Sequence, residues 1–329
     1  MPQGSVLGPL LFLVMLGDID SGIVSSSVSS FADDTRVVAR IQGLQDTTIL
    51  QNDLDTIYQW SSTNNAQFNA EKFECLRYGY NEEIKTTTSY LSNTGSLIEN
   101  ADAIKDLGVT MSCSANFSDH INNITLSANL MCGWIVRTFR TRSQTLILTL
   151  WKSLVLPILD YCCQLWTPSR LGEIQKLEGV QESMVKKITG MAHLNYWEQL
   201  SALNLYSLQR RRERYVAIYM WKILENLTPN FGINVVSNAR TGRYCQVPHV
   251  KTSAQGRVQN LRFNSLAING PRVFNSLPIN LRNMTQCTVE CFKRALDNHL
   301  KIIPDEPRVK KLIPYCSQPS NSLIHMNPK

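Results

Sequence analysis

Several features that would direct a protein out of the cell are absent from this sequence. No lysine or arginine precedes Arg36, so the apolar run from Val6 to Leu16 lacks the basic flank of a secretion signal. The same run is too short to cross a bilayer as a helix. We therefore expect an intracellular protein, cytoplasmic or nuclear, that is not secreted and does not enter a membrane.

Paired cysteine spacing is also lacking. Nine cysteines are present, but Cys162 and Cys163 are adjacent and Cys287 and Cys291 have no second pair near them. Neither a zinc site nor a disulfide framework follows from such spacing. We expect free thiols in a reducing compartment.

Charged residues are few and unevenly distributed. They make up 18% of the chain against 43% hydrophobic residues, a composition typical of globular proteins. Residues 1–110 hold 14 acidic and 6 basic side chains, whereas residues 111–329 hold 12 and 27. An acidic segment beside a basic one suits metal chemistry next to a polyanion. Chance explains the same asymmetry, because the basic residues are scattered and do not form blocks.

Two adjacent carboxylates, Asp33 and Asp34, separate the β-prone runs Val28–Ala32 and Thr35–Ala39. This pattern predicts a tight hairpin with both carboxylates at its tip. Aspartate is common in turns, so the pair taken alone also fits a solvated turn without any chemical role.

The surrounding motifs favour a chemical role. Pro2-Gln3-Gly4-Ser5, an apolar helix and then Phe31-Ala32-Asp33-Asp34 resemble, in order and spacing, the reverse transcriptases of non-LTR (LINE-type) retrotransposons. In that family the first segment contacts template and nucleotide, and the second is the metal-binding hairpin of the palm. The resemblance implies that Asp33 is a bridging Mg²⁺ ligand and Asp34 a secondary carboxylate, with Gln3, Gly4 and Phe31 near the template and nucleotide.

Two further segments extend the resemblance. The run from Leu50 to Lys72 looks like the next palm motif, in which Lys72 would donate a proton to the departing pyrophosphate. An ordinary lysine at a helix C-terminus, favoured by the helix dipole, is an equally open interpretation. Ile104–Val109 resembles the strand whose turn grips the primer end, with Gly108 at a bulge or tight bend.

Helical periodicity begins at Ser118 and continues to Leu227, which predicts a helical thumb. Within it, Trp151–Tyr161 and Leu203–Arg214 resemble the region that follows the palm in the same family. The densest basic cluster of the chain consists of Arg210, Arg211, Arg212 and Arg214. It could neutralise nucleic-acid phosphates, or it could be a solvated helix start that pairs internally with Glu213.

Together these patterns predict an α+β fold that is mostly α. We expect a partial palm over residues 1–80 and primer-grip-like strands over 81–112, then a helical thumb over 113–229, a C-terminal extension over 230–300 and a disordered tail over 301–329. The apolar helix over residues 10–19 should be buried, and the tryptophans at 134, 151, 166 and 221 should lie in the helical core.

The activity that the resemblance implies is RNA-directed DNA polymerisation with Mg²⁺, on an RNA template and a DNA primer, from deoxynucleotides. In the family, the fingers and another catalytic aspartate lie upstream of the Pro-Gln-Gly motif, with which this sequence begins. We therefore expect a fragment of a truncated palm that is inactive alone. The alternative is a non-catalytic nucleic-acid-binding relic or domesticated module.

Overall fold

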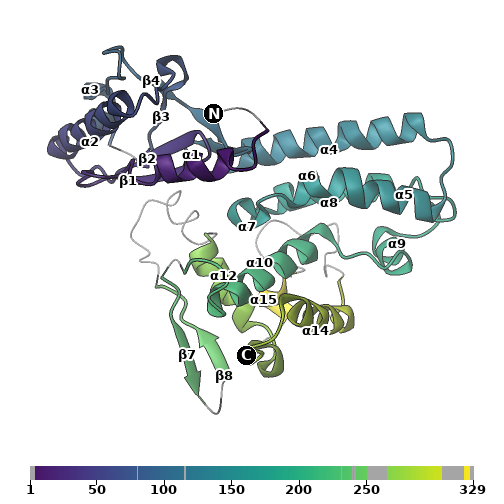
Figure 1. Cartoon of the computed structure of the whole chain (residues 1–329). Coiled ribbons are helices and arrows are strands. Elements are labelled where there is room, and N and C mark those ends of the chain that lie inside the picture. Colours follow the sequence, from purple (N-terminus) through teal and green to yellow (C-terminus); the bar gives the residue numbers. More distant parts are fainter. Residues whose placement is uncertain are drawn as a thin grey trace. The chain divides into compact units, whose positions relative to one another are not determined.

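The structure is a computed structural model that describes residues 4–79, 81–114, 116–230, 232–238, 240, 242–249, 265–305 and 322–326. The chain divides into two compact units, Met1–Ile104 with Ser112–Ser114, and Lys105–Met111 with Ala115–Lys329. Helices predominate, and the described strands pair into four two-stranded sheets (Figure 1). The predicted α+β, mostly α class is therefore confirmed.

The first unit is organised along one long helix, α2 (Leu44–Thr63). Asp46 closes its N-terminus by accepting the backbone N–H groups of Gln42 at 2.6 Å and Gly43 at 3.1 Å. The other elements are α1 (Gly8–Leu16), the antiparallel pair β1 (Ser27–Phe31) and β2 (Asp34–Val38), η1 (Ala70–Lys72), the parallel pair β3 (Glu74–Leu76) and β4 (Glu99–Ala101), and α3 (Glu82–Thr87).

The expected burial of the apolar helix is wrong for α1. The helix ends at Leu16, and none of its residues is buried; Leu13 is 60% and Val14 71% exposed. Ser5 and Pro9 start it together, since the Ser5 hydroxyl accepts the Gly8 N–H at 3.0 Å and Pro9 occupies the first turn. Apolar side chains surround the helix axis, so contacts along one face of α1 leave the apolar side chains of its other faces exposed.

The second unit contains two hydrophobic cores. The first lies among β6 (Val109–Ser112), α4 (Ser118–Thr138), α5 (Gln144–Leu150), the π-helical η2 (Trp151–Val155), α6 (Leu156–Asp160), α7 (Cys163–Trp166), α8 (Leu171–Val185) and α9 (Tyr196–Ala202). The strand β6 pairs with β5 (Ala103–Asp106). Pro157 falls in the first turn of α6, where its missing N–H costs little, and α4 packs against α6 and α8 (Figure 1).

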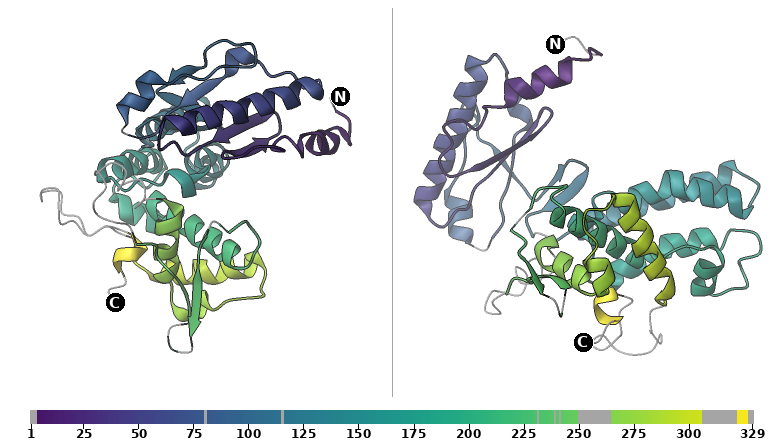
Figure 2. Two further views of the ribbon diagram at one scale, coloured as in Figure 1. Left: turned by 90° about the vertical axis from the view of Figure 1, so that its left-hand side faces the viewer. Right: turned by 60° about the horizontal axis from the view of Figure 1, so that its bottom comes forward.

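The second core forms around α10 (Leu208–Leu224). Its other elements are the hairpin β7 (Val235–Asn238) and β8 (Gly242–Cys245), and the helices α12 (Leu266–Asn275), α13 (Ile279–Arg282), α14 (Val289–Ile302) and α15 (Leu323–Met326) (Figure 2). The rings of Trp221 and Phe292 stack at 4.8 Å. Because Leu208 belongs to the first core and Val216 to the second, α10 serves both.

The expected disordered tail differs from the structure at two places. Helix α14 continues to Ile302, and the following Asp305 accepts the N–H of Ser207 at 2.6 Å. Further on, Leu323 is buried and donates its N–H to Glu213 at 2.9 Å. Both stretches thus pack on α10. None of the described helices has the length and apolar content that crossing a bilayer requires.

Candidate functional site

The carboxylate pair lies on the β1–β2 hairpin, as expected, but one residue away from the predicted register. Phe31 pairs with Asp34 and Ser27 with Val38, so the loop consists of Ala32 and Asp33. Ala32 takes a φ of 52°, a positive value that two-residue hairpin turns require. Asp33 therefore lies in the loop, whereas Asp34 is the first residue of β2.

This register decides which side chains accompany Asp34. Side chains alternate between the two faces of a strand, so Phe31, Asp34 and Arg36 share one face and Val28, Thr35 and Val37 the other. The second set is half-buried, whereas the first set is exposed. Both Asp33 and Asp34 are therefore accessible at one end of the hairpin, with the 68% exposed ring of Phe31 opposite Asp34.

A buried carboxylate that the sequence analysis did not single out holds the start of this hairpin. Asp53 of α2 accepts the backbone N–H groups of Val24 (2.9 Å), Ser25 (3.2 Å) and Ser26 (2.9 Å), and the hydroxyls of Ser25 (3.3 Å) and Ser26 (2.7 Å). Burial acts to raise the pKa of Asp53, but these hydrogen bonds outweigh it and the pKa is lowered. A carboxylate so satisfied fixes the segment that leads into β1.

The other expected residues of the first unit are exposed. Gly4 has a φ of +87°, and nothing lies within 4 Å of the position where a Cβ would stand. Lys72 ends η1, whose first turn Asn69 caps by accepting the Glu71 N–H at 3.1 Å. Both interpretations of Lys72 remain open. Gln3 lies outside the described residues.

Gly108 lies in the second unit, at a tight bend and not within a single strand. Leu107 and Gly108 form the two-residue loop between β5 and β6, with φ values of 44° and 84°. Positive φ at both positions is characteristic of a type I′ hairpin turn. The Tyr161 hydroxyl donates to the Leu107 carbonyl at 2.9 Å, and its ring lies 3.4 Å from the place of a Cβ on Gly108. The bend is therefore held against the end of α6.

The arginine cluster fits neither of its predicted roles in full. Arg210 and Arg212 are 0% and 1% exposed, so their guanidinium groups are neither solvated nor within reach of a nucleic-acid strand. Arg210 forms an ion pair with Asp305, in which its Nε lies 3.8 Å from the carboxylate Oδ1. It also donates a hydrogen bond from Nη2 to the Pro304 carbonyl oxygen at 3.2 Å. A sequence count of basic residues could not reveal this, because Asp305 is far away along the chain.

The two remaining arginines are engaged with carboxylates. Arg211 pairs with Asp160 at 2.6 Å, and Arg214 donates two hydrogen bonds to Asp297 at 2.5 and 2.7 Å. Such two-pronged geometry is the strongest arrangement for this pair of groups. These contacts join α10 to α6 and α14. Together with the Arg210–Asp305 pair, they engage three of the four arginines within the second unit, which differs from the expectation of a phosphate contact.

Comparison with known proteins agrees with the motif. Residues 1–111 match the family model described as reverse transcriptase (RNA-dependent DNA polymerase). The chain is 29% identical over 201 residues to the RNA-directed DNA polymerase from mobile element jockey of Drosophila melanogaster, covering 58% of this chain and 22% of that protein. The corresponding protein of Drosophila funebris is 27% identical over 201 residues, with the same coverage.

A third relative matches this chain over a similar number of residues. The probable RNA-directed DNA polymerase from transposon X-element of Drosophila melanogaster is 26% identical over 198 residues, again 58% of this chain and 22% of the relative. No solved structure matches this chain significantly. The chain thus spans less than a quarter of these relatives. Residues 1–111 carry a reverse transcriptase domain, and the chain is homologous to the RNA-directed DNA polymerases of non-LTR (LINE-type) retrotransposons.

Proposed function

We propose that this chain is part of an RNA-directed DNA polymerase and that its β1–β2 hairpin supplies carboxylate ligands for Mg²⁺. The observation that carries the proposal is the register of the hairpin. It leaves Asp33 in the loop and Asp34 at the start of β2, both exposed, within the segment that matches the reverse transcriptase family. The template would be RNA, the primer DNA and the substrates deoxynucleotides.

The residues present fit a magnesium ion in part. Reverse transcriptases use a divalent metal, and Mg²⁺ is usually bound by one or two carboxylates together with waters and substrate phosphates. Asp33 and Asp34 offer two such carboxylates at an exposed tip. The described residues hold no group of three or more histidine, cysteine or acidic side chains that could hold a metal. The hairpin therefore supplies part of a ligand set, and phosphates or another carboxylate would complete it.

The remaining roles follow the family resemblance. Asp33 is assigned as the bridging ligand and Asp34 as the secondary carboxylate. A bound divalent cation would neutralise negative charge that develops on the phosphate oxygens. The unobstructed backbone at Gly4 allows a close approach of nucleotide or template, and Phe31 stands beside the carboxylates as an apolar contact. Lys72 would protonate the departing pyrophosphate, and the turn at Gly108 would contact the primer.

Binding of Mn²⁺, a paramagnetic substitute for Mg²⁺, tests this assignment. We expect Mn²⁺ to broaden the amide signals of residues 32–34, and an Asp33→Asn/Asp34→Asn double variant to abolish the broadening. Asp55→Asn, which removes an exposed carboxylate from α2, is the matched control and should leave the broadening unchanged. Equal broadening in the parent and the double variant would contradict the assignment.

Primer extension on an RNA template separates a catalytic chain from one that only contributes ligands. We expect the 329-residue chain alone to extend poorly, because both acidic ligands come from one hairpin and a two-ion clamp needs ligands from separate segments. Extension that disappears in Asp33→Asn would establish activity and overturn that expectation. Oligonucleotide binding without Mn²⁺ binding or extension would favour a non-catalytic nucleic-acid-binding module.

A further inference from the structure

Two cysteines of the second unit lie together where α14 begins. Cys287 immediately precedes Thr288, the N-cap of α14, and Cys291 is the third residue of the helix. The thiol of Cys287 is hydrogen-bonded to the thiol of Cys291. Cys291 is exposed, whereas Cys287 is half-buried against the second core, and both are free thiols. The structure thus forms a dithiol from two cysteines whose spacing indicates no zinc site.

Contacts on both sides hold the dithiol in this arrangement. Before it, Gln286 adopts a φ of 52° and donates its N–H to Glu225 Oε2 at 3.0 Å. Glu225 is itself fixed, because its Oε1 pairs with Arg243 at 2.7 Å and each of these side chains is 13% exposed. After it, the Thr288 hydroxyl accepts the Cys291 N–H at 3.2 Å and caps the helix. The fold therefore keeps the two sulfur atoms close.

The two thiols differ in a way that suits stepwise exchange with a disulfide. Cys291 is the exposed sulfur that a reagent in solution reaches first. Burial, followed by the charge and the hydrogen bond of Cys291, raises the pKa of Cys287. The contributions of Cys291 are lost once its sulfur is part of a mixed disulfide. Cys287 then loses its proton more readily and becomes the attacking thiolate.

We propose that Cys287 and Cys291 form a redox site that exchanges with small-molecule disulfides of the glutathione type and closes to an internal disulfide. The Cys291 thiolate attacks one sulfur of the oxidant, which forms a mixed disulfide and releases one oxidant thiolate. The Cys287 thiolate then attacks the Cys291 sulfur, which forms the internal disulfide and releases the second oxidant thiolate. The two protons of the cysteines pass through solvent to the two released thiolates, so the oxidant gains the two electrons that the dithiol loses.

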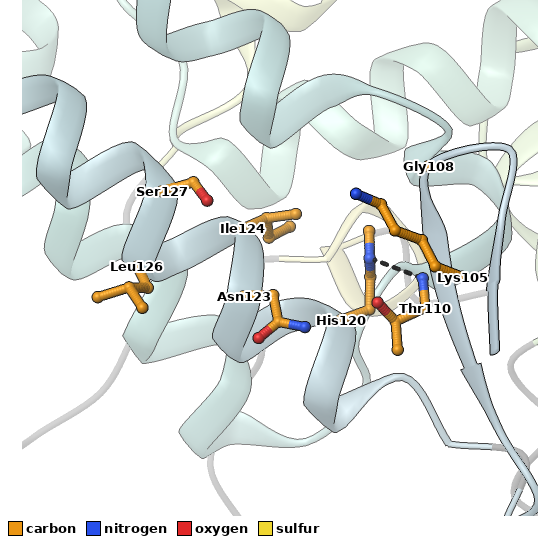
Figure 3. A pocket seen from close by; sticks show the side chains of 8 residues that line it. All are labelled: Lys105, Gly108, Thr110, His120, Asn123, Ile124, Leu126 and Ser127. Atoms are coloured by element: carbon orange, nitrogen blue, oxygen red, sulfur yellow. Dashed lines mark hydrogen bonds between the residues drawn. The ribbon is translucent and has the colours of Figure 1, made fainter. Parts of the chain in front are cut away.

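This redox site is independent of the proposed function. Asp33 and Asp34 belong to the first unit. The turn at Gly108 borders a cleft of about 400 Å³, and none of the eight side chains that Figure 3 labels around this cleft is a cysteine. Failure of metal binding at the hairpin would leave the thiol exchange unchanged, and failure of the exchange would leave the metal assignment unchanged.

A second pair of cysteines in the same chain provides an internal comparison. Cys162 is exposed, but the adjacent Cys163 is 0% exposed, and burial raises the pKa of Cys163 to about 12. At neutral pH Cys163 therefore supplies almost no thiolate to attack a mixed disulfide on Cys162. An adduct on Cys162 should persist, whereas an adduct on Cys291 should be displaced by Cys287.

Oxidised glutathione added to the 329-residue chain at neutral pH, followed by alkylation of free thiols and peptide mass spectrometry, tests the proposal. We expect an internal disulfide that keeps Cys287 and Cys291 joined after cleavage at Glu290, and a glutathione adduct on Cys162. Cys287→Ser should instead carry roughly tenfold more adduct on Cys291 than the parent chain, because the internal thiol that displaces glutathione is gone. Cys113→Ser, which removes another half-buried thiol, is the matched control and should resemble the parent.

Two results would overturn the redox site. One is an equal amount of adduct on Cys291 in the parent and in Cys287→Ser, which would mean that Cys287 does not attack it. The other is equal formation of the internal disulfide in urea, where the contacts of Glu225 and Thr288 are lost. Spacing along the chain alone would then bring the sulfur atoms together, and the fold would not form the site.

Discussion

The two units of the chain are stabilised in different ways. In the first unit the described hydrophobic side chains that are buried are Ile19, Ile57 and Tyr90, and its best-connected buried group is the Asp53 carboxylate. In the second unit two hydrophobic cores share α10. The carboxylate pair thus belongs to the unit that depends on polar contacts, and the arginine cluster of α10 to the unit with extensive apolar packing.

The two units also differ in their buried acidic groups, whose contributions to stability change with pH in opposite directions. Hydrogen bonds outweigh burial at Asp53 and lower its pKa, whereas burial raises the pKa of Glu213 to about 7. Burial also raises the pKa of Glu178 and Asp160 in the second unit. A lowered carboxyl pKa favours folding at neutral pH, and a raised one favours folding in acid. Substitutions in each unit can test this contrast.

The largest effect is expected for Trp221→Ala. Trp221 is fully buried, stacks on Phe292 and donates its indole N–H to the Met284 carbonyl at 2.8 Å. Removal of such a side chain typically costs about 3–5 kcal/mol of unfolding free energy. Urea unfolding followed by circular dichroism measures it. Trp134→Ala is the control, because Trp134 is 47% exposed and should cost about 1 kcal/mol or less. Equal losses of unfolding free energy in the two variants would mean that burial does not determine how much each tryptophan contributes to stability.

A smaller effect, dependent on pH, is expected at Glu213. Its pKa is about 7 in the folded chain against an ordinary 4.5, so between these values the folded state holds a proton that the unfolded state has lost. Its contribution to stability is therefore complete below pH 4.5 and declines as the pH rises from 4.5 through 7, by on the order of 3 kcal/mol. Glu213→Gln cannot titrate and should lack this decline.

The parent chain and Glu213→Gln share all other titratable groups, so the difference between them isolates the contribution of Glu213 from groups whose effect on stability has the opposite pH dependence. Burial lowers the pKa of His120 and His299, whose contributions are lost as the pH falls below the ordinary value of 6.5. Unfolding in urea at a series of pH values gives the difference between the two chains. A difference that stays constant from pH 4 to 8 would show that Glu213 titrates in the folded state as it does in the unfolded state.

In the first unit we expect Asp53→Asn to cost about 1–3 kcal/mol, because one amide replaces a charged acceptor and leaves buried N–H groups unsatisfied. The opening should be local, so hydrogen exchange of residues 27–38 should accelerate. The pH response has the opposite sign to that of Glu213, since stability from Asp53 is present above pH 3.8 and is lost as the pH falls through its lowered pKa. Asp55→Asn is the control, and equal exchange rates in both variants would contradict the role of Asp53.

The sequence predicts elements with local signals and misses contacts between distant residues. Apolar stripes indicate α4 and α8, and the β-prone runs indicate the β1–β2 hairpin. The predicted hairpin register differs from the observed one by one residue, because Ala32 adopts a positive φ that an alanine does not predict. Three of the four tryptophans expected in the core are buried, but Trp134 faces solvent from α4. Side-chain type alone does not indicate which face of a helix is covered.

The residues of the candidate site also divide into those with a local sequence signal and those defined by contacts with distant residues. The Asp33–Asp34 pair could be recognised because a short motif carries it. Asp53 was missed because its partners lie 27 to 29 residues away, and the arginines of α10 were misjudged because Asp160, Asp297 and Asp305 lie 51 to 95 residues from the arginines they pair with. One signal was available for Asp53: it precedes the buried Ile57 by one helical turn, on a face where a charged side chain needs partners.

The smallest effect is expected in α1, and it bears most directly on the contrast between the two units. The sequence predicts that this apolar helix is buried, whereas Leu13 is 60% exposed in the structure. Leu13→Gln should therefore change the unfolding free energy by less than about 0.5 kcal/mol, as for an ordinary surface position. Ile19→Ala, at the buried residue that follows the helix, should cost about 2 kcal/mol or more. Urea unfolding of the two variants decides between the alternatives. If Leu13→Gln destabilises as strongly as Ile19→Ala, the helix is covered in solution, and the first unit has an apolar contact that supplements its polar ones.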